Sequence, residues 1–400
     1  MIPPRTQVGI VGAGPAGLML GHLLHLQGID SVIVEDRSQE HVIERVRAGV
    51  LEQGTVDLMF EVGLGERLQR LGMRHEGIYV AFHDAAAAAH VRHRIDMADL
   101  TGGRTITVYG QNEVVKDLIA ARFSTGRPIV FEAEQVRVHD LGGERPKIRF
   151  ELNRRVQAVE CDFIAGCDGS HGVCRPSIPS DCVTVYQRAY PFAWLGILAN
   201  AAPTSHELVY SLHERGFALF SMRSPEVTRL YLQCAPDELV DAWPDDRVWA
   251  ELKTRLRTAD GWEPNEGEIT QKAVTPMRSL VVEPMRYGRL FLAGDAAHIV
   301  PPTGAKGLNL AMADVWRLSE ALSAFYRKRS ATLLDEYSDR GLRRTWRAQR
   351  FSWWMTAMLH RSESENPFDH RRQIAELDYL VSSRAAMTSL AENYVGIALD

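Results

Sequence analysis

Three glycines near the start of the chain have the spacing of a phosphate-binding turn. Gly12, Gly14 and Gly17 form G-A-G-P-A-G directly after a short apolar run, and a segment with helical spacing follows. The first glycine permits a tight turn, the second lets the backbone approach a pyrophosphate, and the third allows close packing of helix on strand. Glu35 ends the next apolar run, where its carboxylate can accept hydrogen bonds from a ribose. This spacing predicts a dinucleotide-binding unit, without separating NAD from FAD.

The elements around these residues form one βαβ unit. Residues 7–12 and 31–35 predict buried parallel strands, and residues 16–27 predict the helix between them. Further along, alternating residues predict a mostly antiparallel sheet, and everything after Gly307 has helical spacing. We expect helix over 54–71 and 246–256, a surface loop over 85–89, and strands over 77–82, 129–138, 147–161, 194–198, 207–211, 217–222, 228–234 and 290–297.

Composition excludes several classes of protein. A net charge of −5 argues against a nucleic-acid or anionic-membrane partner, because both need a basic surface. No stretch approaches the ~18 consecutive apolar residues of a membrane helix. The five cysteines include no C-x2-C pair, so we expect free thiols in a reducing, cytoplasmic compartment and no metal site.

Two acidic turns extend the glycine motif. G-C-D-G-S-H-G-V-C-R at 166–175 and L-A-G-D-A-A-H at 292–298 resemble the fingerprints of class A flavoprotein aromatic hydroxylases. The resemblance covers nearly the whole chain and is closest to members that act on 4-hydroxybenzoate; only the alanine-rich segment at 83–92 and the residues just after Glu35 depart from it. The segments that carry it lie at 45–54, 107–111, 205–210, 293–310, 351–356 and 391–396.

The resemblance implies an α/β fold with a Rossmann-like, glutathione-reductase-like FAD-binding domain. The implied parts are an FAD domain at 1–182, an antiparallel substrate-binding sheet at 183–275, and a return to the FAD domain with a helical region at 276–400. The implied reaction is hydroxylation of 4-hydroxybenzoate at C3 to 3,4-dihydroxybenzoate, a step of aromatic catabolism that uses NAD(P)H, O2 and a flavin C4a-hydroperoxide. Such a mild electrophile requires an ionised phenol and a site that excludes water.

The resemblance also assigns the substrate residues. Ser221, Arg223 and Tyr231 would hold the benzoate carboxylate, and alternation along a strand puts 221 and 223 on one face. Tyr210 and Tyr394 would relay the phenol proton, with His75 as the exit to solvent. Without the resemblance, each of these residues reads as an ordinary core or surface side chain.

The resemblance also implies the cofactor residues. Asp295 would bind the flavin ribityl chain, and Arg229 would respond to flavin movement. Backbone N–H groups in the loop from Pro302 into the next helix would stabilise negative charge on the flavin. Further implied contacts are Arg47, Gln111, Lys306, Leu308 and Asn309 for FAD, and Arg37, Arg45, His171 and Arg278 for the nicotinamide dinucleotide.

Some alternatives stay open. Asp36 would repel a 2′-phosphate whereas Arg37 could bind one, so the sequence leaves the choice between NADH and NADPH undecided, with a slight preference for tolerance of NADH. A sister hydroxylase for 3-hydroxybenzoate or a dihydroxybenzoate is an alternative, as is a non-catalytic flavin-binding module. A homodimer is expected from the resemblance only.

Overall fold

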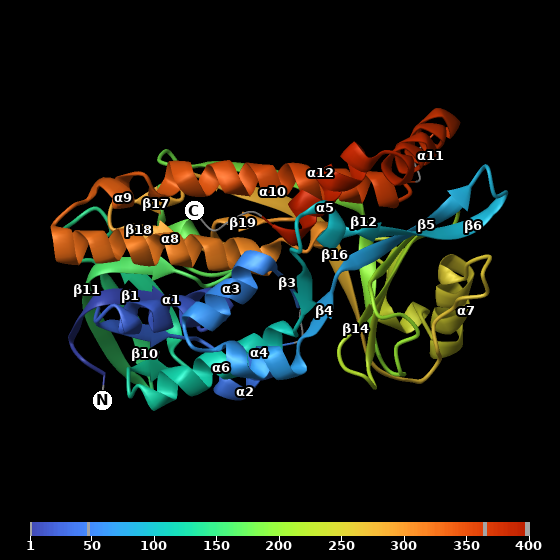
Figure 1. Cartoon of the computed structure of the whole chain (residues 1–400). Coiled ribbons are helices and arrows are strands. Elements are labelled where there is room, and N and C mark those ends of the chain that lie inside the picture. The colour runs from blue at the N-terminus through green and yellow to red at the C-terminus, as the bar shows by residue number, and fades with distance from the viewer. Residues whose placement is uncertain (1, 46–48, 363–365, 397–400) are drawn as a thin grey trace.

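The molecule has two halves in space, each built on one sheet, in a computed structural model that describes residues 2–45, 49–362 and 366–396 (Figure 1). A mostly parallel sheet forms the first half. Its strand order is β17-β18-β11-β1-β2-β8, and β10 and β9 extend it from β11. The neighbours from β18 to β8 pair in parallel. The bounds are β1 Arg5–Val11, β2 Ser31–Val34, β8 Ile129–Val130, β9 Glu134–His139, β10 Lys147–Leu152, β11 Arg155–Gly166, β17 Arg286–Tyr287 and β18 Leu290–Leu292.

The sequence motifs follow the carboxyl ends of four of these strands. β1 leads into Gly12, β2 into Glu35, β11 into the turn with Asp168, and β18 into the turn with Asp295. Because parallel strands end at the same edge of a sheet, these residues meet along one edge. Ligands of open α/β sheets bind at that edge.

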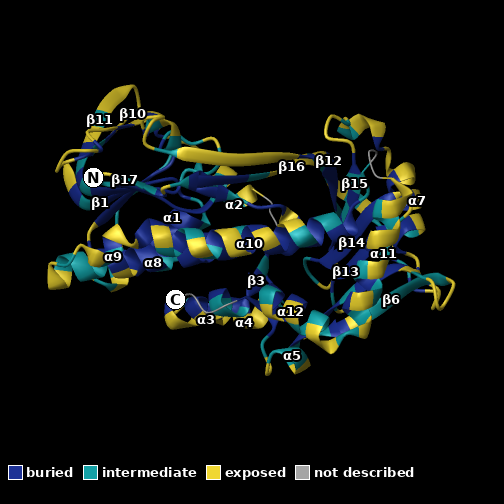
Figure 2. Ribbon diagram, turned by 90° about the horizontal axis from the view of Figure 1, so that it is seen from above, coloured by how far each residue is buried: buried dark blue, intermediate teal, exposed yellow. Residues whose placement is uncertain are grey.

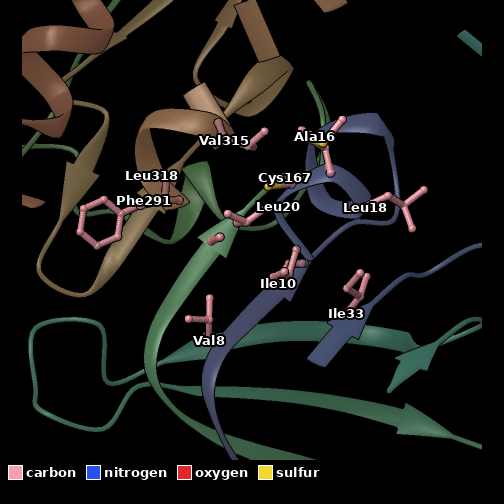
Figure 3. Close-up of a cluster of buried hydrophobic side chains, with 14 of the residues drawn as sticks. Val8, Ile10, Ala16, Leu18, Leu20, Ile33, Cys167, Phe291, Val315 and Leu318 are labelled. Atoms are coloured by element: carbon pink, nitrogen blue, oxygen red, sulfur yellow. The ribbon is translucent and has the colours of Figure 1, made fainter. Parts of the chain in front are cut away.

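Close packing at this edge explains the glycines. Gly12 has φ +103°, and a Cβ there would lie 2.4 Å from the carbonyl oxygen of Cys167. A Cβ on Gly17 would lie 2.0 Å from the carbonyl oxygen of Gly12. Helix α1 (Pro15–Leu26) can therefore pack directly on the sheet and on helix α8 (Gly307–Lys328). Figure 3 shows Val8, Ile10 and side chains of both helices in this core.

The second half contains a mostly antiparallel sheet, which confirms that prediction. The order is β19-β16-β12-β15-β14-β13-β5-β6, and only the β13–β5 pair is parallel. Two of its strands come from inside 1–182, so one continuous part of the chain contributes strands to both sheets. The bounds are β5 Gly77–Asp84, β6 Ala89–Asp96, β12 Thr184–Asn200, β13 Val209–His213, β14 Gly216–Met222, β15 Thr228–Cys234, β16 Glu268–Glu283 and β19 His298–Ile299.

Two long strands and a long helix join the halves. β12 and β16 pair from Thr184–Glu283 to Asn200–Glu268, and Figure 2 shows β16 running between the two halves. Helix α10 (Tyr337–Leu359) contacts α8, β13 and β16. The other helices after Gly307 are α9 Thr332–Asp335, α11 Pro367–Ser382 and α12 Arg384–Val395, so the helical prediction for this region is confirmed among the described residues.

Short elements complete the described chain. β3, β7 and β4 form a small sheet beside the first half, and the 3-10 turns η3 and η4 lie in the segment between β18 and α8. None of the described helices combines the length and apolar character needed to cross a membrane. The bounds are α2 Gln39–Glu44, β3 Val50–Glu52, α3 Gln53–Glu61, α4 Gly65–Leu71, β4 Met73–His75, α5 Met97–Leu100, β7 Ile106–Val108, α6 Gln111–Ser124, η1 Arg175–Ser177, η2 Val240–Ala242, α7 Asp245–Leu256, η3 Gly294–Ala296 and η4 Pro302–Gly304.

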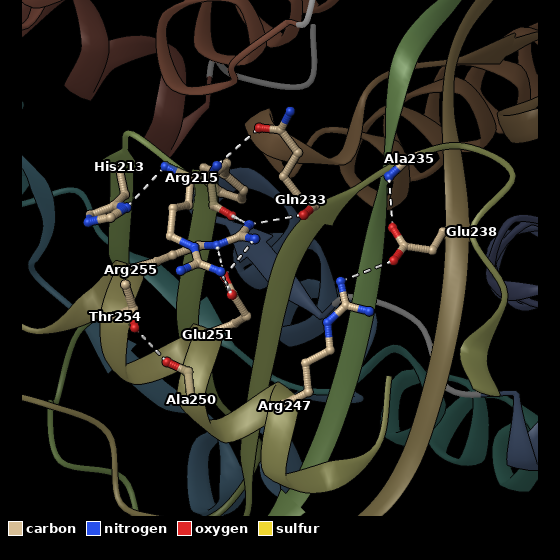
Figure 4. Close-up of polar contacts among 11 residues, drawn as sticks. His213, Arg215, Gln233, Ala235, Glu238, Arg247, Ala250, Glu251, Thr254 and Arg255 are labelled. Atoms are coloured by element: carbon tan, nitrogen blue, oxygen red, sulfur yellow. Dashed lines mark hydrogen bonds and ion pairs between the residues drawn. The ribbon is translucent and has the colours of Figure 1, made fainter. Parts of the chain in front are cut away.

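Helix α7 is fixed to the second sheet by a buried arginine (Figure 4). Arg255 donates from Nε to Glu251 Oε2 at 2.9 Å and from Nη1 to the carbonyl oxygen of Gln233 at 2.9 Å. The ion pair and the carbonyl together satisfy a guanidinium that burial would otherwise penalise. This cluster anchors the strands that carry the predicted substrate residues.

Several local expectations need correction. The strand expected over 290–297 ends at Leu292, because Gly294 takes φ +62° and the turn η3 follows. The expected strands 129–138 and 147–161 are each divided, into β8 and β9 and into β10 and β11. The helix expected over 54–71 is two helices, α3 and α4, separated at Val62–Leu64 where Gly63 takes φ +78°. The alanine-rich segment is a turn at 85–88, as expected, but the polar residues after it form strand β6. An edge strand can be polar on both faces, so alternation gave no signal there.

Candidate active site

Glu35 organises the glycine turn. Its Oε2 accepts a hydrogen bond from the backbone N–H of Ala13 at 2.6 Å, and its Oε1 accepts one from Arg37 N–H at 3.0 Å. Burial, with a smaller contribution from Asp36, raises the pKa of Glu35 to about 7, although both N–H donors favour the ionised form. The carboxylate therefore stands at the end of β2, beside the turn, where a ribose can reach it.

The start of α1 has room for a pyrophosphate. Apart from Gly14 and its two chain neighbours, no described residue has an atom within 4 Å of the position that a Cβ on Gly14 would take. Gly14 is also the N-cap of α1 and makes no side-chain cap, so the first N–H groups of the helix face this space. The residues at this edge thus fit the dinucleotide part of FAD.

The two acidic turns differ in how they are held. Asp168 accepts from the backbone N–H of Cys174 at 2.8 Å, while its second oxygen is buried without a partner among the described residues, and burial raises its pKa. Asp295 is half-buried in η3. This turn is fixed from behind, because Asp314 Oδ2 accepts from Gly294 N–H at 3.0 Å and lies 2.7 Å from His298 Nε2.

The loop after Pro302 is tied to β3. Lys306 Nζ donates to Glu52 Oε1 at 2.6 Å and to the carbonyl oxygen of Tyr394 at 3.1 Å. Asn309 accepts from Glu52 N–H at 2.9 Å and donates to the carbonyl oxygen of Val50 at 3.0 Å. Both side chains therefore shape the loop through protein contacts. Their contact with FAD stays a prediction, as it does for half-buried Leu308 and Gln111.

A pocket lies where the loop after Pro302 faces the second sheet. It brings together the predicted clamp, the predicted relay residue Tyr210, and Arg229, which is predicted to respond to flavin movement. Its apolar walls suit an aromatic ring, and its two guanidinium groups suit an anion. The lining residues are Gly49, Val50, Val108, Trp194, Leu208, Tyr210, Leu219, Ser221, Arg223, Arg229, Tyr231, Pro302 and Ala305.

Both arginines of the pocket are poorly solvated. Burial lowers the pKa of Arg223, with the charge of Arg229 contributing in the same direction. Arg229 lies over the ring of Tyr231 at 5.1 Å, and its Nε and Nη1 are buried with no partner among the described residues. Unsatisfied guanidinium donors beside a cavity favour an anionic ligand.

The two tyrosines form a buried pair. Tyr210 and Tyr394 share a hydrogen bond between their hydroxyl groups, and their rings meet edge to face with centroids 6.2 Å apart. Burial raises the pKa of both hydroxyl groups. They therefore stay neutral and can pass a proton along their hydrogen bond without holding charge.

His75 does not match its expected place at the solvent. It is 1% exposed in β4, and neither ring nitrogen has a hydrogen-bond partner among the described residues. Burial lowers its pKa to about 4. In this conformation the imidazole is buried, so the exit to solvent stays a prediction that requires His75 to move.

The predicted nicotinamide residues are dispersed over the surface. Arg37 is 63% exposed and forms an ion pair with Asp36 at 3.6 Å. His171 and Arg278 are exposed, and both lie near Arg175, which donates to the carbonyl oxygen of Ser170 and is influenced by the charge of Arg278. Arg45 is exposed at the end of α2, and Arg47 lies outside the described residues.

Sequence reasoning missed several residues of the site. Trp194 and Leu219 line the pocket, and Glu52 and Asp314 fix the flavin-side loops. Glu52 stands inside the quoted 45–54 segment, so a signal was present for it. Trp194 lies within a strand whose alternation gives no hint of which face lines a pocket.

Known proteins resemble this chain over most of its length. Residues 5–352 match the family described as "FAD binding domain". The chain is 50% identical to p-hydroxybenzoate hydroxylase of Acinetobacter baylyi over 396 residues, which cover 99% of this chain and 96% of that protein. It is 26% identical to a rifampicin monooxygenase of Rhodococcus hoagii over 80% of this chain and 64% of that protein.

The fold has a close structural counterpart. The crystal structure of p-nitrophenol 4-monooxygenase PnpA from Pseudomonas putida DLL-E4 superposes with a TM-score of 0.79 at 19% identity, covering 98% of this chain and 99% of that one. At that identity the likeness concerns the fold. Together with the near full-length relative, these matches show that the chain belongs to the FAD-binding-domain family and, within it, to the class A flavoprotein aromatic hydroxylases.

Proposed function

We propose that the chain hydroxylates 4-hydroxybenzoate at C3, giving 3,4-dihydroxybenzoate, with FAD, NAD(P)H and O2. The observation that carries this proposal is that Arg223, Arg229 and Tyr210 line one pocket whose walls are mostly apolar. A para-hydroxylated benzoate has an anion and a phenol at opposite ends of one ring, and the pocket offers a group for each. The half-identical relative named p-hydroxybenzoate hydroxylase supports the same substrate.

The clamp orients the substrate. Arg223 would bind the carboxylate with two parallel N–H donors, and the hydroxyl groups of Ser221 and Tyr231 would complete the set. Ser221 and Arg229 are cross-strand partners, so strands β14 and β15 fix the geometry. Burial of the charged pair strengthens its attraction and excludes water.

The tyrosines ionise the phenol. Tyr210 would accept a hydrogen bond from the substrate hydroxyl while it bonds to Tyr394, so the proton can leave along the pair. A phenolate carries more electron density at the ring carbons ortho to its C–O carbon, and C3, the carbon to be hydroxylated, is one of them. FAD, when bound and reduced, would activate O2 for transfer to that carbon. The glycine turn, Glu35 and the loop from Pro302 to Asn309 would hold the FAD.

The electron donor, the assembly state and the compartment belong to the same proposal. The ion pair between Arg37 and Asp36 offsets the positive charge that a 2′-phosphate would need, which supports tolerance of NADH. All five cysteines are free thiols, which supports a reducing, cytoplasmic compartment. We expect a homodimer, which size-exclusion chromatography with light scattering would test.

The decisive experiment measures NADH and NADPH oxidation by the FAD-loaded protein across substituted benzoates. We expect strong stimulation by 4-hydroxybenzoate and formation of 3,4-dihydroxybenzoate. Stimulation by 3-hydroxybenzoate or a dihydroxybenzoate in its place would assign the chain to a sister activity. FAD binding without stimulation by any phenol would identify a non-catalytic module. A stopped-flow comparison of flavin reduction by the two nucleotides would settle the donor.

A further inference from the structure

The indole of Trp194 forms one wall of the substrate pocket. Trp194 is buried in β12 and lines the cavity together with Arg223 and Tyr231. Its ring is tilted against that of Tyr231, with centroids 4.8 Å apart. The position of this indole therefore determines both the width of the pocket and the orientation of a clamp residue.

A histidine outside the pocket lies behind this indole. His360 follows the last residue of α10 and is 3% exposed. Its imidazole stacks on Phe217 with centroids 4.4 Å apart and on Phe192 with centroids 4.6 Å apart. Trp194 Nε1 donates a hydrogen bond to His360 Nε2 at 2.7 Å.

The contacts of His360 allow one protonation state. Its Nδ1 lies 3.0 Å from the carbonyl oxygen of Thr356, which can only accept, so Nδ1 carries the hydrogen. The indole N–H can only donate, so Nε2 must present its lone pair. Burial also lowers the pKa of His360 to about 3. The imidazole is thus neutral and accepts the indole hydrogen bond, and its contact with Thr356 of helix α10 orients it toward the indole.

We propose that His360 is a positioning residue that fixes the Trp194 indole and, through it, the Tyr231 ring and the shape of the pocket around a single-ring aromatic acid. The inference rests on the proposed function, because it assigns this shape to substrate recognition. Without the acceptor, a buried indole N–H is left unpaired, and the ring turns to find another partner or pays the desolvation penalty.

Two substitutions separate the hydrogen bond from the packing. His360→Phe keeps an aromatic ring for stacking but removes both nitrogens, whereas His360→Gln can place an amide oxygen near the position of Nε2. We expect His360→Phe to raise KM for 4-hydroxybenzoate about 10-fold, within the range for an unpaired buried donor. We expect kcat to change by less than about 2-fold, because the tyrosine pair is untouched. His360→Gln should recover most of the KM.

A matched control comes from helix α10 itself. Trp354 Nε1 donates to Glu376 Oε1 at 2.9 Å, a second indole hydrogen bond that does not involve His360, and Trp354 does not line the pocket. Trp354→Phe should lower the melting temperature while KM stays unchanged. Equal increases of KM in Trp354→Phe and His360→Phe would overturn the proposal, since they would show a scaffold effect. A failure of His360→Gln to recover KM would also count against the hydrogen bond.

A spectroscopic readout keeps the inference separate from the proposed function. The ultraviolet resonance Raman band of the indole N–H, obtained for Trp194 by difference against Trp194→Phe, needs no turnover. We expect a strongly hydrogen-bonded indole in the natural chain and a shift toward a free N–H in His360→Phe. An unshifted band would overturn the positioning role even in an active enzyme. Absence of 4-hydroxybenzoate turnover with a shifted band would instead overturn the proposed function.

Discussion

Replacing Arg223 with alanine should weaken substrate binding strongly. The side chain lines a pocket whose walls are mostly apolar, and burial already lowers its pKa, so its charge is poorly screened by water. Removing one partner of a buried, hydrogen-bonded charge pair costs about 2–5 kcal/mol. That range corresponds to roughly 30- to 4000-fold in Kd. Because Arg229 stays in the same pocket, we expect the lower part, roughly 30- to 300-fold.

The assay is a titration of the flavin absorbance change with 4-hydroxybenzoate. Repeating it with uncharged 4-hydroxybenzamide isolates the charge: the preference for benzoate over benzamide should shrink by the same factor in Arg223→Ala. A suitable control is Arg247→Ala, because Arg247 lies over Trp243 at the surface of the same half and should not affect Kd. A change of less than about 3-fold in Arg223→Ala would refute its role in the clamp.

Three further predictions concern proton transfer, the glycine turn and the buried ion pair. Tyr394→Phe removes the hydrogen bond to Tyr210 and should lower the rate of hydroxylation by roughly 10²-fold; an unchanged pH profile of kcat would contradict the relay. The pKa of Glu35 is raised from 4.5 to about 7, so between these pH values the folded chain keeps a proton that the unfolded chain has released. The free energy of unfolding of the FAD-free protein should therefore fall as pH rises from about 4.5 to 7. Glu35→Gln should remove this pH dependence in thermal unfolding measured from pH 5 to 8. Asp314→Asn breaks the buried pair with His298 and should lower the free energy of unfolding by about 3–5 kcal/mol in denaturant unfolding. Because the pKa of His298 is raised in the folded chain, this decrease should have its full size below pH 6.5 and become smaller as pH rises above it.

Local sequence patterns predicted which edge of the first sheet faces the cofactor, because each motif directly follows a strand. Gly12 and Glu35 lie within one βαβ unit, where spacing along the sequence determines spacing in the fold. The turns with Asp168 and Asp295 follow buried apolar strands that alternation and composition could identify. Parallel pairing then brings all four positions to one edge.

Long-range pairing explains what local patterns did not reveal. β5 pairs with β13 in parallel, joining residues near 80 to residues near 210, so the second sheet takes strands from a part of the chain that the sequence placed with the first. Lys306 and Glu52 are 254 positions apart, and Trp194 and His360 are 166 apart. No periodicity connects such residues. For the tyrosine pair and the clamp, family resemblance supplied the identification that the residues alone did not.

The most direct test of the central claim follows one oxygen atom. The FAD-loaded protein, given 4-hydroxybenzoate, a reduced nicotinamide nucleotide and ¹⁸O₂, should yield 3,4-dihydroxybenzoate in which the new C3 hydroxyl carries the label, with little hydrogen peroxide. Mass spectrometry of the product reads this outcome in one experiment. Nucleotide oxidation that yields only hydrogen peroxide, or a product hydroxylated elsewhere on the ring, would contradict a pocket that holds the ring between a guanidinium clamp and a tyrosine pair.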